Sequence, residues 1–177
     1  MRTSLTHPLY VTWVELNSEG GRIGMTLCPG KYQPHSMTGG WNRDLSLDIG
    51  TLVDLRVNRL ISLVTDEDMH VLQVPQLPEM VARAGLDWNH IPLTDSATPT
   101  DAWLNSCLEV IHELTVSIPN GELVVVHCMG GMSRAGMFVA LTLWWQGLPM
   151  AEAIQRVRQT RGNRCINNRQ EHYLLHM

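Results

Sequence analysis

The sequence lacks the features that mark several large classes of protein. Its four cysteines are widely spaced, with no CxxC pair, which excludes a disulfide scaffold and a zinc knuckle. No apolar run approaches the ~20 residues of a membrane span, and residues 1–10 do not have the pattern of a signal peptide. We therefore expect a cytoplasmic protein with reduced cysteines.

Positive charge is also scarce. Lys31 is the only lysine, and 13 basic residues against 17 acidic ones give a formal net charge of −4. This balance disfavours a nucleic-acid binder and a polybasic membrane protein, so we expect neither kind of partner. An anionic substrate would need a local positive site. Arginine suits bidentate binding of phosphate, but a genome rich in G and C would produce the same excess of arginine.

The chain is long enough for one domain with a sizeable core, since it has 177 residues of which 44% are apolar. Strand and helix patterns alternate, which predicts a single α/β domain over residues 1–177 with a central, mostly parallel sheet flanked by helices. The predicted elements are strands at 10–16 and 23–28, a helix capped by Asp44, a strand at 60–65 followed by an acidic turn at 66–68, a helix from Pro78, a strand at 86–93, a helix at 101–116, a strand at 123–126, and helices at 135–145, 150–161 and 167–176. The helix at 135–145 is expected to bury Trp144 and Trp145 on its core face.

The most informative segment joins a buried strand to a helix. After the apolar run at 123–126 comes His127-Cys128-Met129-Gly130-Gly131-Met132-Ser133-Arg134. Glycines let backbone N–H groups turn inward into a nest for an anion, and the next helix directs its positive dipole end at the same point. We expect a phosphate-binding loop that consists of Met129, Gly130, Gly131, Met132, Ser133 and Arg134.

Cys128 lies at the base of this predicted nest. The surrounding N–H dipoles and a guanidinium favour its thiolate form, which is a nucleophile at neutral pH. Arg134 would bind two phosphoryl oxygens and stabilise the charge that spreads over them in the transition state. The predicted reaction is phosphoryl transfer through a cysteinyl-phosphate, with no metal and no other cofactor.

This loop resembles the signature of the cysteine-dependent protein tyrosine and dual-specificity phosphatases. The chain is similar to the branch of kinase-associated phosphatases and their bacterial relatives in the segments 23–31, 60–68, 91–95 and 161–171, and the likeness extends over about residues 22–177. The resemblance implies a protein phosphatase that hydrolyses phosphotyrosine, and also phosphoserine and phosphothreonine, in phosphoprotein substrates. It also implies a kinase or a kinase complex as a partner.

The same resemblance implies roles for individual residues. Cys128 matches the nucleophile, Arg134 the phosphate-binding arginine, and His127 the residue that tunes the cysteine. Asp95, which lies 33 residues before the cysteine, matches the general acid, and Asp101 is the alternative if the intervening loop folds differently. Gln170 matches a glutamine that flanks the site.

Three positions depart from the family pattern. Ala135 stands where a Ser or Thr usually assists departure of the thiolate, and Ile166 stands where many members have a water-positioning glutamine. Ser133 replaces a glycine, which risks strain if the backbone needs a positive φ there. These departures leave open an alternative function, a catalytically weak module that binds phosphoproteins through the same loop. A sulfur-transfer or arsenate-reducing enzyme is disfavoured, because relatives of that type carry their loop near the N-terminus.

The remaining reactive residues have simpler interpretations. We expect Cys28, Cys107 and Cys165 to be inert buried packing, and His172 and His176 to face solvent, since no third metal ligand is evident. Five arginines between residues 156 and 169 are expected to form a solvated helix face, and the alternative is a docking patch for acidic or phosphorylated partners. The loop's variable positions carry no cation, which favours one phosphate per binding event.

Overall fold

The fold is built on a central mixed sheet of five strands. The computed structural model describes residues 1–16, 21–36 and 39–177. The strands lie in the order β1 (Thr12–Glu15), β2 (Arg22–Leu27), β7 (Val124–Cys128), β5 (Arg59–Ser62) and β6 (Asp87–His90). β1 is antiparallel to β2, and the other neighbouring pairs are parallel. The predicted α/β class with a mostly parallel sheet is therefore confirmed.

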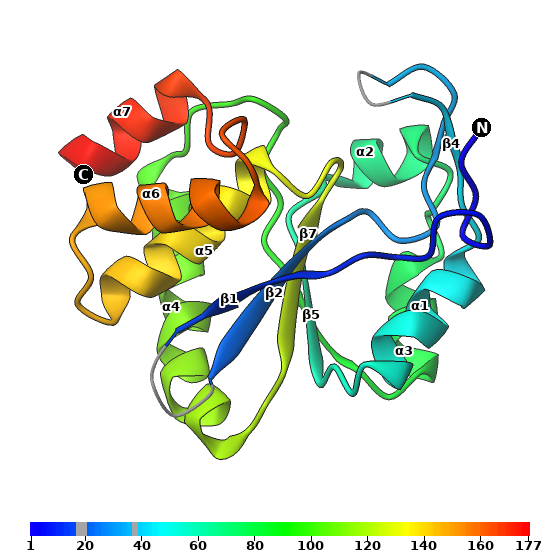
Figure 1. The fold of residues 1–177 in the computed structure, drawn as a ribbon, viewed down its shortest axis with the longest axis horizontal. Helices are drawn as coiled ribbons and strands as arrows, with labels where there is room; N and C mark the ends of the chain where they lie inside the picture. Colours follow the sequence, from blue (N-terminus) through cyan, green and yellow to red (C-terminus); the bar gives the residue numbers. More distant parts are fainter. Residues whose placement is uncertain (17–20, 37–38) are drawn as a thin grey trace.

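Helices cover both faces of this sheet (Figure 1). One face carries α4 (Asp101–Ser117), α5 (Ser133–Trp145), α6 (Met150–Arg161) and α7 (Asn168–His176), and the other carries α1 (Leu45–Asp54), α2 (Asp66–Val71) and α3 (Leu77–Arg83). Each face has its own apolar cluster. Within β7, Val124 and Val126 belong to the cluster under α4–α7 and Val125 to the cluster under α1–α3, as expected for a strand buried on both faces.

Helix caps explain where two of these helices begin. Asp44 caps α1 by accepting a hydrogen bond from the backbone N–H of Leu47. Thr65 and Asp68 form a reciprocal capping box at the start of α2. The prediction of an acidic turn at 66–68 is therefore wrong, because these carboxylates form the first turn of a helix, where they interact favourably with its dipole.

Two further differences concern the ends of elements and very short strands. Trp144 and Trp145 are 36% and 41% exposed at the end of α5, so the prediction that they are core residues is wrong. A small two-stranded sheet, formed by β3 (Tyr32–Gln33) and β4 (Trp41–Asn42), was not predicted, because two residues are too few to show periodicity. None of the helices in the described ranges has the length and hydrophobicity needed to span a bilayer.

The parallel register brings the functional segments together. Leu27 pairs with Cys128, and Ser62 pairs with His127, so β2, β5 and β7 end at the same edge of the sheet. The chain segments that leave these three strands therefore meet there, as is usual for sites in open α/β sheets.

Candidate active site

The loop from Cys128 to Arg134 connects β7 directly to α5. Gly131 has a φ of +66°, and a Cβ at this position would lie 2.3 Å from the carbonyl carbon and oxygen of Thr26 in β2. Only glycine fits both the left-handed conformation and this close approach. Ser133 is the first residue of α5 and is not among the residues with positive φ, so the strain considered for it does not arise.

Two cations hold backbone carbonyls on the outside of the loop. The Lys31 Nζ donates to the carbonyl of Met129 at 3.2 Å, and the Arg161 Nε donates to the carbonyl of Gly131 at 3.0 Å. In a trans peptide the carbonyl and the following N–H point in opposite directions. The N–H groups of Gly130 and Met132 are therefore turned away from Lys31 and Arg161, which is the arrangement that an anion-binding nest requires.

Arg134 is fully buried at the start of α5, and only one side of its guanidinium is hydrogen-bonded. Its Nη1 donates to the Asp68 Oδ2 at 2.6 Å and to the carbonyl of Leu93 at 2.7 Å. Its Nε and Nη2 make no hydrogen bond with any described residue. Burial alone would lower the pKa of Arg134, but the Cys128 sulfur and the Asp68 carboxylate raise it overall. The guanidinium therefore keeps its charge and offers a two-donor edge that suits an oxyanion.

Two carboxylates approach this guanidinium, one from a helix and one from a loop. Asp68 lies in the first turn of α2, and the half-exposed Asp95 places its Oδ1 3.2 Å from the Arg134 Nη2. Sequence reasoning missed Asp68 as a site residue, although its position after a buried parallel strand was an available signal. Asp101, the alternative acid, is exposed at the start of α4, and no described contact joins it to Arg134.

The residue before the cysteine, His127, belongs to a buried hydrogen-bonded chain. The Trp88 Nε1 donates to the Ser62 Oγ at 2.8 Å, and this oxygen lies 2.6 Å from the His127 Nε2. If the Ser62 hydroxyl donates to the His127 Nε2, the imidazole carries its own proton on Nδ1, which has no hydrogen-bond partner among the described residues. Burial is the main cause that lowers the pKa of His127 to about 3. The ring is therefore neutral and held beside Cys128, which is itself only 2% exposed.

Gln170 connects α7 to the loop. Its Oε1 accepts from the Ser133 Oγ at 2.8 Å and from the backbone N–H of Asn167 at 3.0 Å, while its buried Nε2 has no partner among the described residues. Ile166 is buried with a φ of +61°, and Ala135 is buried on α5. Thus neither of these two positions supplies a polar group, whereas Gln170 retains an unused donor.

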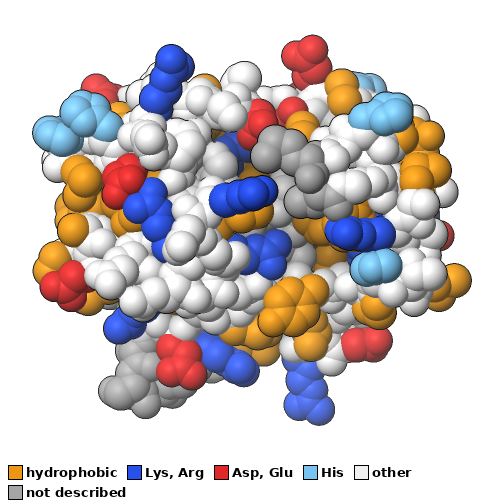
Figure 2. Space-filling model, turned by 45° about the horizontal axis from the view of Figure 1, so that its top comes forward, with side chains coloured by type: hydrophobic (Ala, Val, Ile, Leu, Met, Phe, Trp, Pro, Cys, Tyr) orange, Lys and Arg blue, Asp and Glu red, His pale blue; other side chains and the backbone are white. Residues whose placement is uncertain are grey.

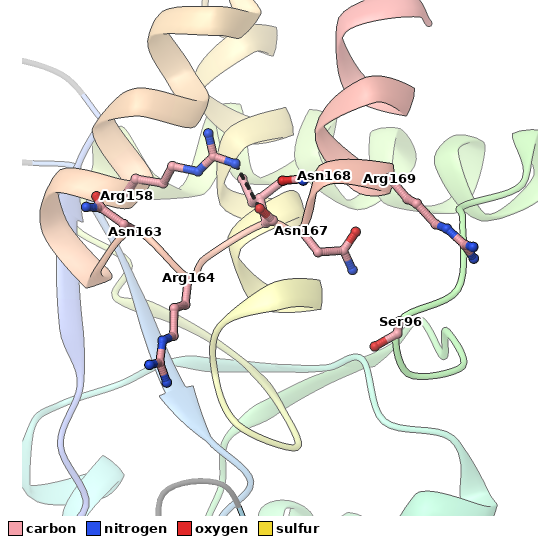
Figure 3. A pocket seen from close by; sticks show the side chains of 8 residues that line it. Ser96, Arg158, Asn163, Arg164, Asn167, Asn168 and Arg169 are labelled. Carbon is pink, nitrogen blue, oxygen red and sulfur yellow. Dashed lines mark hydrogen bonds between the residues drawn. The ribbon is translucent and has the colours of Figure 1, made fainter.

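The arginines of residues 156–169 divide into two kinds. Arg158 binds the Glu171 carboxylate at 2.7 Å and the carbonyls of Cys165 and Ile166, and Arg161 holds the loop, so a solvated face is wrong for these two. Arg164 and Arg169 are exposed and extend from opposite ends of a groove of about 670 Å³ (Figure 3). Its other lining residues are Ser96, Arg158, Asn163, Ile166, Asn167 and Asn168. Because Ser96 follows Asp95 in the chain, this groove reaches the segment that carries Asp95.

The other cysteines and the histidine pair do not join the loop chemistry. Burial raises the pKa of the Cys28 and Cys107 thiols, and raises that of Cys165 to about 11, so all three are protonated at neutral pH. His172 and His176 are exposed, with ring centroids 4.2 Å apart. In the described ranges no group of three or more His, Cys, Asp or Glu side chains is placed to hold a metal ion.

Comparison with known proteins identifies the family. The family described as PTP-SAK, Swiss Army Knife protein, DSP-PTPase phosphatase domain, matches residues 32–173. Human cyclin-dependent kinase inhibitor 3 is 25% identical over 171 residues, which cover 96% of this chain and 78% of the human protein. Human protein tyrosine phosphatase type IVA 3 is 36% identical over 89 residues, which cover 50% of this chain and 49% of that protein.

Solved structures share the fold. A crystal structure of kinase associated phosphatase, in which serine replaces the catalytic-site cysteine, has a TM-score of 0.84 at 24% identity and covers 94% of this chain and 92% of that chain. The crystal structure of Tk-PTP in its active form has a TM-score of 0.68 at 20% identity, with 93% and 94% coverage. The chain therefore belongs to the family of DSP-PTPase phosphatase domains, and it is an enzyme of the protein tyrosine and dual-specificity phosphatase class.

Proposed function

We propose that this enzyme hydrolyses phosphotyrosine, together with phosphoserine and phosphothreonine, in proteins through a phosphorylated Cys128. The observation that carries the proposal is the Nε and Nη2 edge of the buried Arg134, at the start of the helix that follows Cys128. This edge makes no hydrogen bond with a described residue, and its ion-pair partner, the half-exposed Asp95 carboxylate, lies 3.2 Å from Nη2. Buried donors without partners are costly, and an oxyanion in the loop would satisfy them. The outward carbonyls of Met129 and Gly131 support the same site, because they leave the intervening N–H groups free for the phosphate.

The proposed reaction has two steps. In the first, the Cys128 thiolate attacks phosphorus, the bond between phosphorus and the ester oxygen breaks, and this oxygen takes a proton from Asp95. In the second, water attacks the phosphocysteine, Asp95 accepts a proton from that water, and the thiolate departs as inorganic phosphate forms. Arg134 and the loop N–H groups stabilise the oxygens in both transition states.

Asp95 must change its contact for this reaction. Its carboxylate lies 3.2 Å from the Arg134 Nη2, on the side of the guanidinium that the phosphate would use. We expect phosphate to replace Asp95 there, so that the half-exposed carboxyl group moves towards the leaving oxygen. Ser96, the residue after Asp95, lines the adjacent groove, so a substrate bound in that groove would contact the segment that carries Asp95.

A first experiment tests the nucleophile. Hydrolysis of an aryl phosphate, with and without vanadate, is measured for the wild type, Cys128→Ser and the control Cys107→Ser, which also replaces a buried cysteine. We expect only Cys128→Ser to abolish the vanadate-sensitive rate, with unfolding temperatures recorded for all three proteins. Equal rates for wild type and Cys128→Ser would eliminate the mechanism.

A second experiment tests the acid. Asp95→Ala and Asp101→Ala are compared on aryl phosphates with good and poor leaving groups. Loss of a general acid slows poor leaving groups most, by about 10²-fold or more, and we expect this selective effect for Asp95→Ala. The opposite order would transfer the role to Asp101.

The alternative function, phosphoprotein capture without turnover, is favoured by the apolar Ala135 and Ile166, which provide no group to assist breakdown of the intermediate. Rapid-mixing kinetics separate the two functions. A burst of released alcohol followed by slow turnover indicates an enzyme limited by its second step, whereas tight phosphopeptide binding with no released product indicates a binding module.

The wider context is part of the proposal. We infer that residues 1–177 act as a single domain in the cytoplasm and that the substrates are phosphoproteins. The name of the kinase associated phosphatase relative supports a kinase or kinase complex as a partner. Pull-down with the substrate-trapping variant Asp95→Ala, followed by identification of the captured phosphoproteins, would test this assignment.

A further inference from the structure

Positive side chains gather locally although the chain as a whole is acidic. Figure 2 shows Lys and Arg side chains across the middle of one face, with apolar side chains between them. The groove of about 670 Å³ at the connection between α6 and α7 is lined by Arg158, Arg164 and Arg169, and by no Asp or Glu. The sequence allowed two interpretations of these arginines, a solvated helix face and a docking patch. The contacts of each arginine distinguish the two.

Arg158 has a structural role. Its Nη2 lies 2.7 Å from the Glu171 Oε2, and its Nε and Nη2 donate to the carbonyls of Cys165 and Ile166 at 3.1 and 2.9 Å. Glu171, the acidic residue in the first turn of α7, is therefore already neutralised. These contacts also hold the segment that joins α6 to α7 and carries Arg164, so the groove is formed before a partner binds.

Arg164 and Arg169 are different. Both are exposed, and neither guanidinium forms an ion pair or a hydrogen bond with any described residue. Arg169 is also the second residue of α7, where the positive end of the helix dipole repels its charge. Neither side chain stabilises the fold through a described contact, so both guanidiniums are available to an external anion.

Two connections join this groove to the catalytic loop. Ser96, which lines the groove, directly follows Asp95, the proposed general acid. Beside α7, the backbone N–H of Asn167 donates to the Gln170 Oε1, which also accepts from the Ser133 Oγ of the loop. The groove is therefore within reach of residues that adjoin a phosphorylated side chain held in the loop.

The remaining polar lining suits an extended peptide. The side-chain amides of Asn167 and Asn168 lie between Arg164 and Arg169, in the sequence and in Figure 3. Amides both donate and accept hydrogen bonds, as the backbone of an extended segment requires. Guanidinium groups pair well with carboxylates. Two of them at opposite ends of one groove match two acidic side chains of one segment.

We propose that this groove binds an acidic segment of the protein substrate, next to the phosphorylated residue, through Arg164 and Arg169. The two guanidiniums pair with Asp or Glu side chains, and the asparagine amides bind the backbone between them. The inference rests on the proposed function and names the class of phosphoprotein, one with carboxylates on one side of its phosphorylated residue. A protein segment is favoured over a lipid headgroup because the two cations are spread along a groove and do not converge on one point.

The experiment compares phosphopeptides of one sequence that differ only in the residues beside the phosphorylated residue. One pair has two glutamates or two glutamines on the N-terminal side, and a second pair has them on the C-terminal side. The measured quantity is the ratio of kcat/KM for each glutamate peptide to that for its glutamine analogue. For one of the two placements we expect a ratio of about five or more, the effect of two exposed ion pairs, and high salt should reduce it.

Variants locate the preference. Arg164→Gln and Arg169→Gln should each lower the ratio by about twofold, and the double variant should lower it to about one. Both side chains are exposed, so the variants are expected to fold, and a general loss of activity cancels in the ratio. Arg156→Gln removes an equal charge from the exposed side of α6, outside the groove, and should leave the ratio unchanged. Combining Arg164→Glu with Arg169→Glu should instead favour a peptide with lysines in place of the glutamates.

The outcomes are distinct. Equal kcat/KM for the glutamate and glutamine peptides overturns the inference and leaves the proposed function intact, whereas no hydrolysis of any phosphopeptide overturns the proposed function itself. A preference for glutamate that survives in the double variant of Arg164→Gln and Arg169→Gln belongs to cations outside the groove and also overturns the inference. Higher kcat/KM for soluble inositol phosphates than for the glutamate peptides would overturn the choice of a protein segment.

Discussion

Replacing Gly131 with alanine should damage the loop much more than the same replacement at Gly130, although the two glycines are adjacent. Gly131 has a φ of +66°, and its added Cβ would lie 2.3 Å from the carbonyl carbon and oxygen of Thr26. A Cβ at Gly130 has no atom within 4 Å, and its φ lies outside the positive range. The pair therefore separates loss of glycine as such from loss of the close approach to β2.

The expected magnitude follows from two costs. The left-handed conformation costs an alanine about 1 kcal/mol, and overpacking against a backbone that must shift costs about 1–3 kcal/mol more. We expect Gly131→Ala to lower the free energy of unfolding by about 2–4 kcal/mol, which corresponds to a fall of about 5–15 °C in Tm for a domain of this size. A displacement of the loop N–H groups by about 1 Å should also reduce kcat/KM for an aryl phosphate by about 10²-fold.

Thermal unfolding followed by circular dichroism and steady-state hydrolysis of an aryl phosphate measure these two effects. Gly130→Ala should stay within about 1 kcal/mol of the wild type, because nothing opposes its methyl group. If Gly131→Ala matches Gly130→Ala in both Tm and kcat/KM, the close contact with Thr26 does not constrain the loop and the reasoning fails.

Three further predictions follow from the site. Asp68→Asn weakens the contact that orients Arg134, so kcat/KM for an aryl phosphate should fall about tenfold and tungstate should bind less tightly. Tighter binding of tungstate by the variant would mean that Asp68 acts by neutralising the charge of Arg134. The pKa of His127 is lowered to about 3, below its unfolded value of about 6.5, so the unfolded state binds the extra proton as the pH falls. The free energy of unfolding should therefore fall by a few kcal/mol between about pH 6.5 and pH 3. Chemical denaturation should show a shallower pH dependence in His127→Gln than in the wild type, and equal slopes would refute the assignment. Burial lowers the pKa of Lys31 to about 8, so the affinity of the wild type for tungstate should decline as the pH rises through about 8. Lys31→Met should lack this decline, and an identical decline in the variant would assign the titration to another group.

Much of the fold could be predicted because its signals are local. The apolar run before His127, the alternation of strands with helices and the capping residue Asp44 each act within a few residues, and the predicted elements and sheet class follow from them. Local signals misplace what depends on distant packing. Trp144 and Trp145, for example, are exposed at the end of α5. The acidic residues 66–68 are a different case, because the capping box of Thr65 and Asp68 that begins α2 is itself a local signal.

The sequence by itself determined the loop chemistry, because Cys128, the glycines and Arg134 lie within seven consecutive residues whose functional groups serve one anion. Only the tertiary structure decided what surrounds that loop. Asp68 meets Arg134 across 66 positions, and Lys31 meets the Met129 carbonyl across 98, since the parallel register brings the ends of β2, β5 and β7 to one edge. The groove between Arg164 and Arg169 likewise depends on chain segments that are distant in sequence, and net charge, which is a sum over the whole chain, contains no information about where cations gather.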